Sequence, residues 1–157
     1  MLADHLAEQL HVPHIELDAL YWGPKWTAAD REVVRARVRT AVLASAWVID
    51  GNYSFLRDLV WPRLQDVIWL DYPLPVILWR LVLRTWQRTV NKELLWGTNY
   101  ERFWQQFFSA DSLFFWALRS YRRHRSLYAD LLARPENSTL LVFHFLSPGD
   151  TDTWLQK

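Results

Sequence analysis

The 157-residue sequence contains no cysteine, which excludes disulfide bridges and thiolate chemistry. It has only four glycines, and none of them precedes a lysine, so the phosphate-binding loop G-x-x-x-x-G-K-[ST] cannot be assembled. An excess of charge of one sign is also missing, because 18 basic and 17 acidic residues leave a net charge of +1. This balance does not itself indicate a nucleic-acid partner.

Long apolar runs are absent as well. The longest, SLFFWAL and TLLVF, are far shorter than the roughly 20 residues that a membrane-spanning helix requires. Near the start, Asp4, His5 and Glu8 interrupt any secretory apolar region. We therefore expect a cytoplasmic protein without a membrane partner, and the lack of cysteine agrees with a reducing compartment.

What the sequence does have is tryptophan, at 11 positions. So many indole rings predict large aromatic walls, either buried or lining a cleft. Half of the residues are apolar, and the length suffices for one domain with a real core. The sequence thus predicts a single domain over 1–157.

Apolar strands alternate with helices along the chain. The strands are predicted at about 14–18, 46–54, 64–73 and 138–147, and the helices at about 2–10, 27–42, 75–90, 112–133 and 148–157. The stretch 91–112 fits neither pattern because Gly97, Thr98 and Asn99 interrupt it, and we expect a mobile helical flap there. The alternation indicates an α/β fold with a parallel sheet.

Local signals define two of these helices further. Leu2, Leu6 and Leu10 recur every four residues and predict one apolar face on the first helix. Thr27 followed three residues later by Asp30 resembles a capping box, which predicts the start of the second helix.

Two carboxylates are expected at the carboxyl ends of neighbouring parallel strands, where α/β proteins bind ligands. Asp18 ends the strand in IELDALYW, and Asp50 ends the strand in VIDGNYS, just before Gly51, which lets a ligand approach the backbone. Three aromatic residues stand beside them in the sequence: Tyr21, Trp22 and Tyr53. Such a pair suits a Mg²⁺ shell or a substrate hydroxyl, whereas the alternative is that each carboxylate caps the following turn.

Arginine is concentrated in two places. Arg80, Arg84 and Arg88 form one helical stripe with no acidic residue between them, which favours binding of an anion such as phosphate. A second cluster, in RSYRRHR, contains Arg119, Arg122, Arg123 and Arg125. It suits phosphate, nucleic acid or an anionic surface. For both groups the alternative interpretation is an exposed, solvated helix face.

Histidine gives weaker signals. His11 and His14 flank Pro13 without a third metal ligand nearby, so we expect no metal site there. His144 lies within an apolar strand, and we interpret it as a packed core residue rather than a catalytic base.

Three stretches carry a family resemblance: LADHLAEQLHVPHIELDALYWGPKW, WVIDGNYSFLRDLVWPR and VIWLDYP. They resemble the adenylate-kinase-related P-loop proteins known as DNA topology modulation proteins, over essentially the whole chain and most specifically in LDALYW and DGNYS. The resemblance implies a three-layer fold of the P-loop nucleotide-kinase type. Its five parallel strands have the order 2-3-1-4-5, with helices on both faces.

The resemblance also implies an activity and a site. ATP and Mg²⁺ would be the cofactors, and a nucleotide or small molecule would accept the phosphoryl group. Asp50 would orient Mg²⁺ through water, and Arg84 and Arg88, in a lid over about 80–112, would steady the transferring group. Asp111 and Arg119 echo a later kinase motif.

Further residues take their roles only from this resemblance. The acceptor site would contain Asp18, Tyr21, Trp22, Gly51, Tyr53 and Arg57. Ser147 and Pro148 would lie near the base of the nucleotide.

One departure from the family is large. Relatives carry a first strand and the phosphate loop just before LADHLAEQL, and this sequence contains neither. We expect that about 15 residues, a strand plus the loop, lie upstream. The central strand of the sheet would then be missing, and the 157 residues alone would be inactive and bind no ATP.

Two alternatives remain open at this point. The basic RSYRRHR helix and the tryptophans could form a nucleic-acid-binding module without enzyme activity, using phosphate contacts and base stacking. The chain could instead be a degenerate fragment without a function of its own. Neither the acceptor nor the oligomeric state follows from the sequence.

Overall fold

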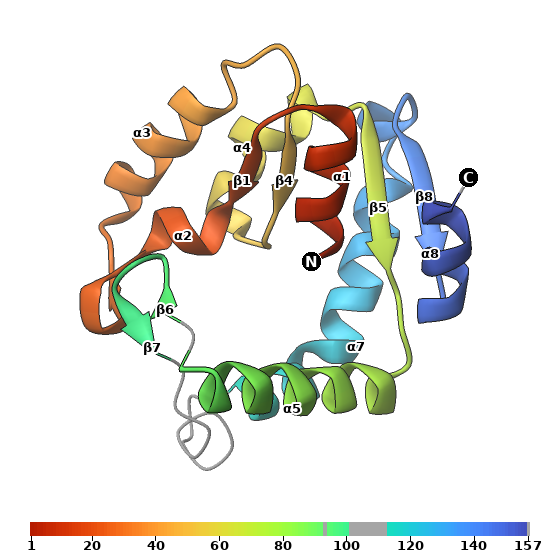
Figure 1. The fold of residues 1–157 in the computed structure, drawn as a ribbon. Coiled ribbons are helices and arrows are strands. Elements are labelled where there is room, and N and C mark those ends of the chain that lie inside the picture. The colour runs from red at the N-terminus through yellow and green to blue at the C-terminus, as the bar shows by residue number, and fades with distance from the viewer. Residues whose placement is uncertain (93, 101–112, 157) are drawn as a thin grey trace. The chain divides into compact units, whose positions relative to one another are not determined.

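The structure is a computed structural model, and it describes residues 1–92, 94–100 and 113–156 (Figure 1). The chain forms two compact units. Unit 1 comprises Met1–Leu64 and Trp96–Asn99, and unit 2 comprises Gln65–Leu95 and Tyr100–Lys157. Each unit combines helices with a parallel strand pair, which confirms the α/β class.

Unit 1 is built around two parallel strands. Its elements are α1 (Leu2–Leu10), β1 (His14–Glu16), α2 (Leu17–Tyr21), β2 (Trp22–Gly23), η1 (Pro24–Trp26), β3 (Thr27–Ala28), α3 (Arg31–Ala41), β4 (Val48–Asp50), η2 (Ser54–Leu56), α4 (Arg57–Val60) and η3 (Trp61–Arg63). β1 and β4 lie side by side in parallel, with Ile15 opposite Ile49 and Glu16 opposite Asp50 (Figure 1). β2 and β3 form a short antiparallel pair.

The core of unit 1 forms where α3 packs against the strands and α4. Val34 and Val38, one helical turn apart, are fully buried, and Leu56 is 1% exposed. Asp30 caps α3 by accepting a hydrogen bond from the backbone N–H of Glu32 at 2.8 Å. The predicted capping box is therefore wrong.

Thr27 lies outside α3, because it belongs to β3. Its hydroxyl donates instead to the carbonyl of Pro24 at 2.8 Å, so a local turn satisfies it.

The face expected on α1 packs except at its end: Ala7, which lies beside the leucines, is buried, and Leu2 and Leu6 are half-buried, whereas Leu10 is 61% exposed. The expectation for the next strand needs correction. β1 ends at Glu16, and Asp18 lies in the first turn of α2 rather than at a strand end. Leu17 is buried where it starts α2, and an apolar alternation of three residues cannot distinguish this from a longer strand.

Unit 2 contains the second parallel pair. Its elements are β5 (Asp66–Leu70), α5 (Leu74–Val90), β6 (Leu94–Leu95), α7 (Leu113–Leu132), η4 (Pro135–Asn137), β8 (Leu141–Phe145) and α8 (Pro148–Leu155). β5 pairs with β8 over five residues, from Asp66 opposite Leu141 to Leu70 opposite Phe145. Trp154 of α8 packs on Phe143 and Phe145, which project to one face of β8.

The expected flap is only partly described. β6 pairs with β7 (Asn99–Tyr100), so its described part contains short strands where a helix was expected. Residues 101–112, including Asp111, lie outside the described residues. Among the residues that are described, no helix is both long and apolar enough to cross a membrane.

Candidate functional site in unit 1

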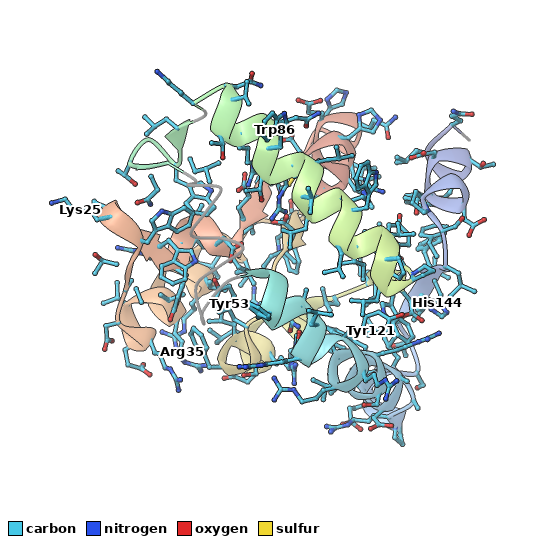
Figure 2. All side chains as sticks on the ribbon, turned by 90° about the horizontal axis from the view of Figure 1, so that it is seen from below. Lys25, Arg35, Tyr53, Trp86, Tyr121 and His144 are labelled. Carbon is cyan, nitrogen blue, oxygen red and sulfur yellow. The ribbon has the colours of Figure 1, made fainter. Side chains whose placement is uncertain are left out.

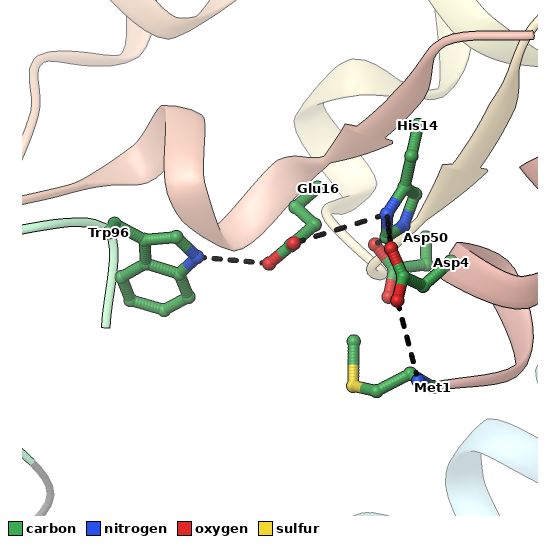
Figure 3. A network of polar contacts seen from close by, with 6 residues as sticks. All are labelled: Met1, Asp4, His14, Glu16, Asp50 and Trp96. Atoms are coloured by element: carbon green, nitrogen blue, oxygen red, sulfur yellow. Dashed lines mark hydrogen bonds and ion pairs between the residues drawn. The ribbon is translucent and has the colours of Figure 1, made fainter. Parts of the chain in front are cut away.

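A cluster of acidic side chains surrounds one histidine beside the β1–β4 pair (Figure 3). Glu16 and Asp50 end the two strands, whereas His14 begins β1 and Asp4 lies on α1. Nε2 of His14 lies 3.3 Å from a carboxylate oxygen of Asp50. On the other side of the ring, Nδ1 lies 3.6 Å from Asp4 and 4.0 Å from Glu16. We call these four residues the His14 cluster.

The geometry of the His14 cluster matters for charge. The His14 side chain is 13% exposed, and carboxylate oxygens face both of its ring nitrogens. The Nε2 atom of His14 is buried and makes no hydrogen bond to the residues that the structure describes, so the contact with Asp50 is one of proximity between a ring and a carboxylate. The carboxylates of Glu16 and Asp50 are about one-third exposed, so they remain open to solvent and to a ligand.

Asp50 is the member of the cluster whose ionisation is most disturbed. Burial raises the pKa of its carboxyl above 3.8, and the nearby charges of Glu16 and Asp18 raise it further. His14 opposes this shift but does not outweigh burial. A carboxyl group whose pKa is shifted by burial and by neighbouring charges is a feature that functional sites often share.

This shift predicts a pH-dependent effect of replacing Asp50 with asparagine. Because the pKa of Asp50 is raised in the folded protein, protonated Asp50 stabilises the folded state relative to the unfolded one. This stabilisation is complete below about pH 3.8 and is lost as the pH rises through the pKa of the folded state. Asp50→Asn escapes that loss. Urea unfolding should therefore show the variant to be more stable than the wild type at pH 7, with little difference at pH 3.

Asp4→Asn is the matched control. Asp4 contacts the same histidine but is 58% exposed, so its replacement should not increase stability at pH 7. If Asp50→Asn proved less stable than the wild type at pH 7, the pairing with His14 would outweigh burial and the assignment would be wrong.

The predicted acceptor-site aromatics do come together beside Asp18. The Tyr53 hydroxyl donates to the Asp18 carboxylate at 2.5 Å, and the ring of Tyr53 lies 4.8 Å from that of Tyr21. Tyr21 in turn meets Trp22 edge-on at 4.8 Å. Burial and the Asp18 carboxylate raise the pKa of Tyr53, so it remains a neutral hydrogen-bond donor.

The backbone conformation and the packing at position 51 both require glycine. Its φ is +112°, and a Cβ added there would lie 2.7 Å from the Cβ of Leu17. The backbone after β4 thus turns in a conformation that other residues rarely adopt, directly against α2. This close packing places Asp50 next to α2 and accounts for Gly51 without a ligand.

The remaining predicted site residue of unit 1 is Arg57, which begins α4. A groove of about 630 Å³ lies nearby in the unit and is lined by Arg31, Glu32, Arg35, Arg39, Phe55 and Asp58. Arg35 is labelled in Figure 2. It donates two hydrogen bonds to Asp58 at 2.6 and 2.8 Å, which keeps the pKa of that carboxyl below its usual range. None of the predicted site residues lines this groove.

The other predicted site residues belong to unit 2. Arg84 and Arg88 lie on α5, and Arg119 lies on α7. Ser147 caps α8 in a capping box with Asp150, and Pro148 is the first residue of that helix. The capping box explains this Ser-Pro pair structurally, and nothing in its geometry requires a nucleotide base.

Unit 2 also contains a buried charge cluster that the sequence did not predict. The carboxylate of Asp71 is 4% exposed and forms an ion pair with Arg125, whose Nε lies 2.9 Å from it. Nε2 of His144 lies 3.1 Å from the same oxygen, and its ring stacks on Trp69 at 4.2 Å. The interpretation of His144 as a packed core residue is wrong, because its side chain is 40% exposed and paired with a carboxylate.

Sequence reasoning also missed His14 and Glu16 as site residues. Both lie in β1 two positions apart, so they share one side of the strand. That spacing was a usable signal. Trp96, whose indole N–H donates to Glu16 at 2.9 Å, is 80 residues away and left no such signal.

No group of three or more His, Asp or Glu side chains in the described part of the chain has the geometry of a metal site. Comparisons with protein families, with curated proteins and with solved structures found no match for this chain.

Proposed function

We propose that this chain provides the acceptor-binding part of a cytoplasmic phosphotransferase related to the adenylate-kinase-like P-loop proteins. In such an enzyme the phosphoryl group of ATP passes to a nucleotide or to another small molecule. The observation that carries the proposal is the group formed by Glu16, Asp50 and Asp18 at the carboxyl edge of a parallel strand pair, where α/β proteins bind ligands.

The strand pairing supports this relationship. In the order 2-3-1-4-5, the second strand neighbours the third, the fourth neighbours the fifth, and all run parallel. β1 pairs with β4, and β5 pairs with β8, both in parallel. These are the neighbours that the order requires if the four strands are the second to the fifth. Isolated parallel pairs are unusual, so each pair favours membership of a larger sheet.

The carboxylates of the acceptor site also support the proposed phosphotransferase function. Tyr53 fixes the orientation of Asp18, and His14 lies 3.3 Å from Asp50. Carboxylates placed in this way can accept hydrogen bonds from an acceptor and orient it for transfer. In an enzyme of that family, Asp50 would also orient a hydrated Mg²⁺, a role that it takes from the resemblance alone.

ATP itself does not fit the residues present. The glycines are Gly23, Gly51, Gly97 and Gly149, and the residues that follow them are proline, asparagine, threonine and aspartate. A triphosphate needs a cradle of backbone N–H groups and a lysine beside it. We therefore derive no transfer step for these 157 residues.

The proposal predicts that the 157-residue chain does not bind Mg-ATP. Isothermal titration should give no heat beyond dilution, because the acceptor site offers carboxylates where a triphosphate needs donors and cations. Titration with a divalent salt alone is the control for heat from the metal. Micromolar affinity for Mg-ATP would contradict the proposal.

Nucleic-acid binding remains the second candidate. It is favoured by exposed arginines on α7: Arg119, Arg122 and Arg123. Arg125, on the same helix, contributes less because the carboxylate of Asp71 neutralises it. Substituting single-stranded DNA for Mg-ATP in the same titration distinguishes the two. Binding that weakens steeply with salt would favour the nucleic-acid function.

A further inference from the structure

The acceptor site of unit 1 is bordered by a continuous line of aromatic rings. Trp96 contacts Trp26 at 5.7 Å, and Trp26 contacts Trp22 at 5.9 Å. From Trp22 the line continues through Tyr21 to Tyr53, with 4.8 Å between the ring centres at each step. All five rings are partly exposed. We call them the aromatic line.

Both ends of the aromatic line are tied to carboxylates. At one end the indole N–H of Trp96 donates to Glu16 at 2.9 Å, and Glu16 lies between that indole and His14 (Figure 3). At the other end the Tyr53 hydroxyl donates to Asp18 at 2.5 Å. The polar atoms of the terminal rings are thereby occupied, and what these rings can offer a ligand is their faces.

The middle of the aromatic line is held by a buried amide. Asn99 is 2% exposed, accepts from the backbone N–H of Trp26 at 2.9 Å and donates to the carbonyl of Gly23 at 3.0 Å. It holds Lys25 and Trp26 at positive φ, a conformation that costs free energy in residues other than glycine. The indole of Trp26 is thus fixed in place between its two neighbouring rings.

The charge of the site complements these rings. Asp4, Glu16, Asp18 and Asp50 contribute four carboxylates, and two basic groups lie against them: the N-terminal amine of Met1, 3.9 Å from Asp4, and the ring of His14. The carboxylates outnumber these two groups, which favours a cationic ligand over a neutral or anionic one. Partly exposed aromatic faces beside carboxylates are the surroundings in which proteins bind organic cations.

We propose that the acceptor bound at this site carries a protonated amino group, which lies against the aromatic line and pairs with Glu16 and Asp18. This inference rests on the proposed function and names its substrate class. The amine supplies the positive charge, and another part of the same molecule would take the phosphoryl group. The site then selects amines over neutral molecules of the same shape.

Tryptophan fluorescence of the full chain tests this with glucosamine as the cationic probe and N-acetylglucosamine as its neutral counterpart. We expect glucosamine to bind at least about tenfold more tightly. Glu16→Gln and Asp18→Asn should each weaken glucosamine binding by about fivefold or more, whereas Glu8→Gln, an exposed change on α1, should have no effect.

Two results would overturn the inference: equal affinity for the two sugars, or no measurable binding of glucosamine. Neither result bears on the proposed function, which the separate Mg-ATP titration tests, because the aromatic line contains no part of a triphosphate site. Binding of glucosamine that is insensitive to both Glu16→Gln and Asp18→Asn would likewise overturn the assignment, since the charge would then be recognised elsewhere.

Discussion

Replacing Arg125 and His144 together by alanine is expected to destabilise the protein by about 3–5 kcal/mol. The carboxylate of Asp71 is 4% exposed, and these two side chains hold it at 2.9 and 3.1 Å. Without them a buried charge loses its partners and must either remain uncompensated or take up a proton. Urea unfolding at pH 7, followed by tryptophan fluorescence, measures the loss.

Adding Asp71→Asn to the double variant provides the control. The amide needs no cation, so the triple variant should recover at least about 1 kcal/mol relative to the double variant. A general loss of packing predicts the opposite, because each further substitution would then lower the free energy of unfolding. A triple variant no more stable than the double one would show that Asp71 is not the source of the effect.

Gly51→Ala is expected to have the second largest effect, a loss of about 2–4 kcal/mol. Two costs add at this position. The backbone is held at a φ of +112°, and the new methyl group would lie 2.7 Å from the Cβ of Leu17, which a side-chain rotation cannot move. The chain after β4 would have to shift away from α2, taking Asp50 with it.

Two other glycines separate these costs. Gly97 has a φ of +72° with nothing within 4 Å of an added Cβ, so Gly97→Ala carries backbone strain alone and should cost about 1 kcal/mol. Gly149 lies in α8 with 3.8 Å to its nearest neighbour, and Gly149→Ala should be neutral or slightly stabilising. If Gly51→Ala were no worse than Gly97→Ala, the close packing against Leu17 would be refuted.

Most secondary structure could be predicted from the sequence, because long apolar patterns decide it. The helix expected at 75–90 is α5, Leu74–Val90, and the helix expected at about 27–42 is α3, Arg31–Ala41. Short elements were harder to predict. A three-residue strand followed directly by a five-residue helix gives too few periods to tell the two apart, which is why Asp18 was placed on a strand.

The candidate site was predictable where its residues are close in sequence. Asp50 and Tyr53 are three residues apart, and both lie at the site beside Asp18. Trp96 could not have been found in this way. It reaches Glu16 from 80 residues away through one side-chain hydrogen bond, and no local pattern encodes such a contact.

The charge cluster of unit 2 was missed for a related reason. Asp71, Arg125 and His144 come from three separate elements, and Arg125 looked in the sequence like one more exposed arginine of a basic helix. His144 looked apolar because its neighbours in β8 are Phe143 and Phe145. The alternation of the strand points His144 away from those two rings, and that alternation was the signal to use.

The central claim is that the carboxyl edge of β1 and β4 binds an acceptor that carries a protonated amino group, and amide chemical-shift mapping of the ¹⁵N-labelled chain tests it most directly. Addition of glucosamine should shift the amides of Glu16, Asp50 and Gly51 together with the indole N–H of Trp96, whereas Mg-ATP should shift none of them. If those signals stay in place with glucosamine, or if Mg-ATP is the ligand that moves them, the claim is contradicted.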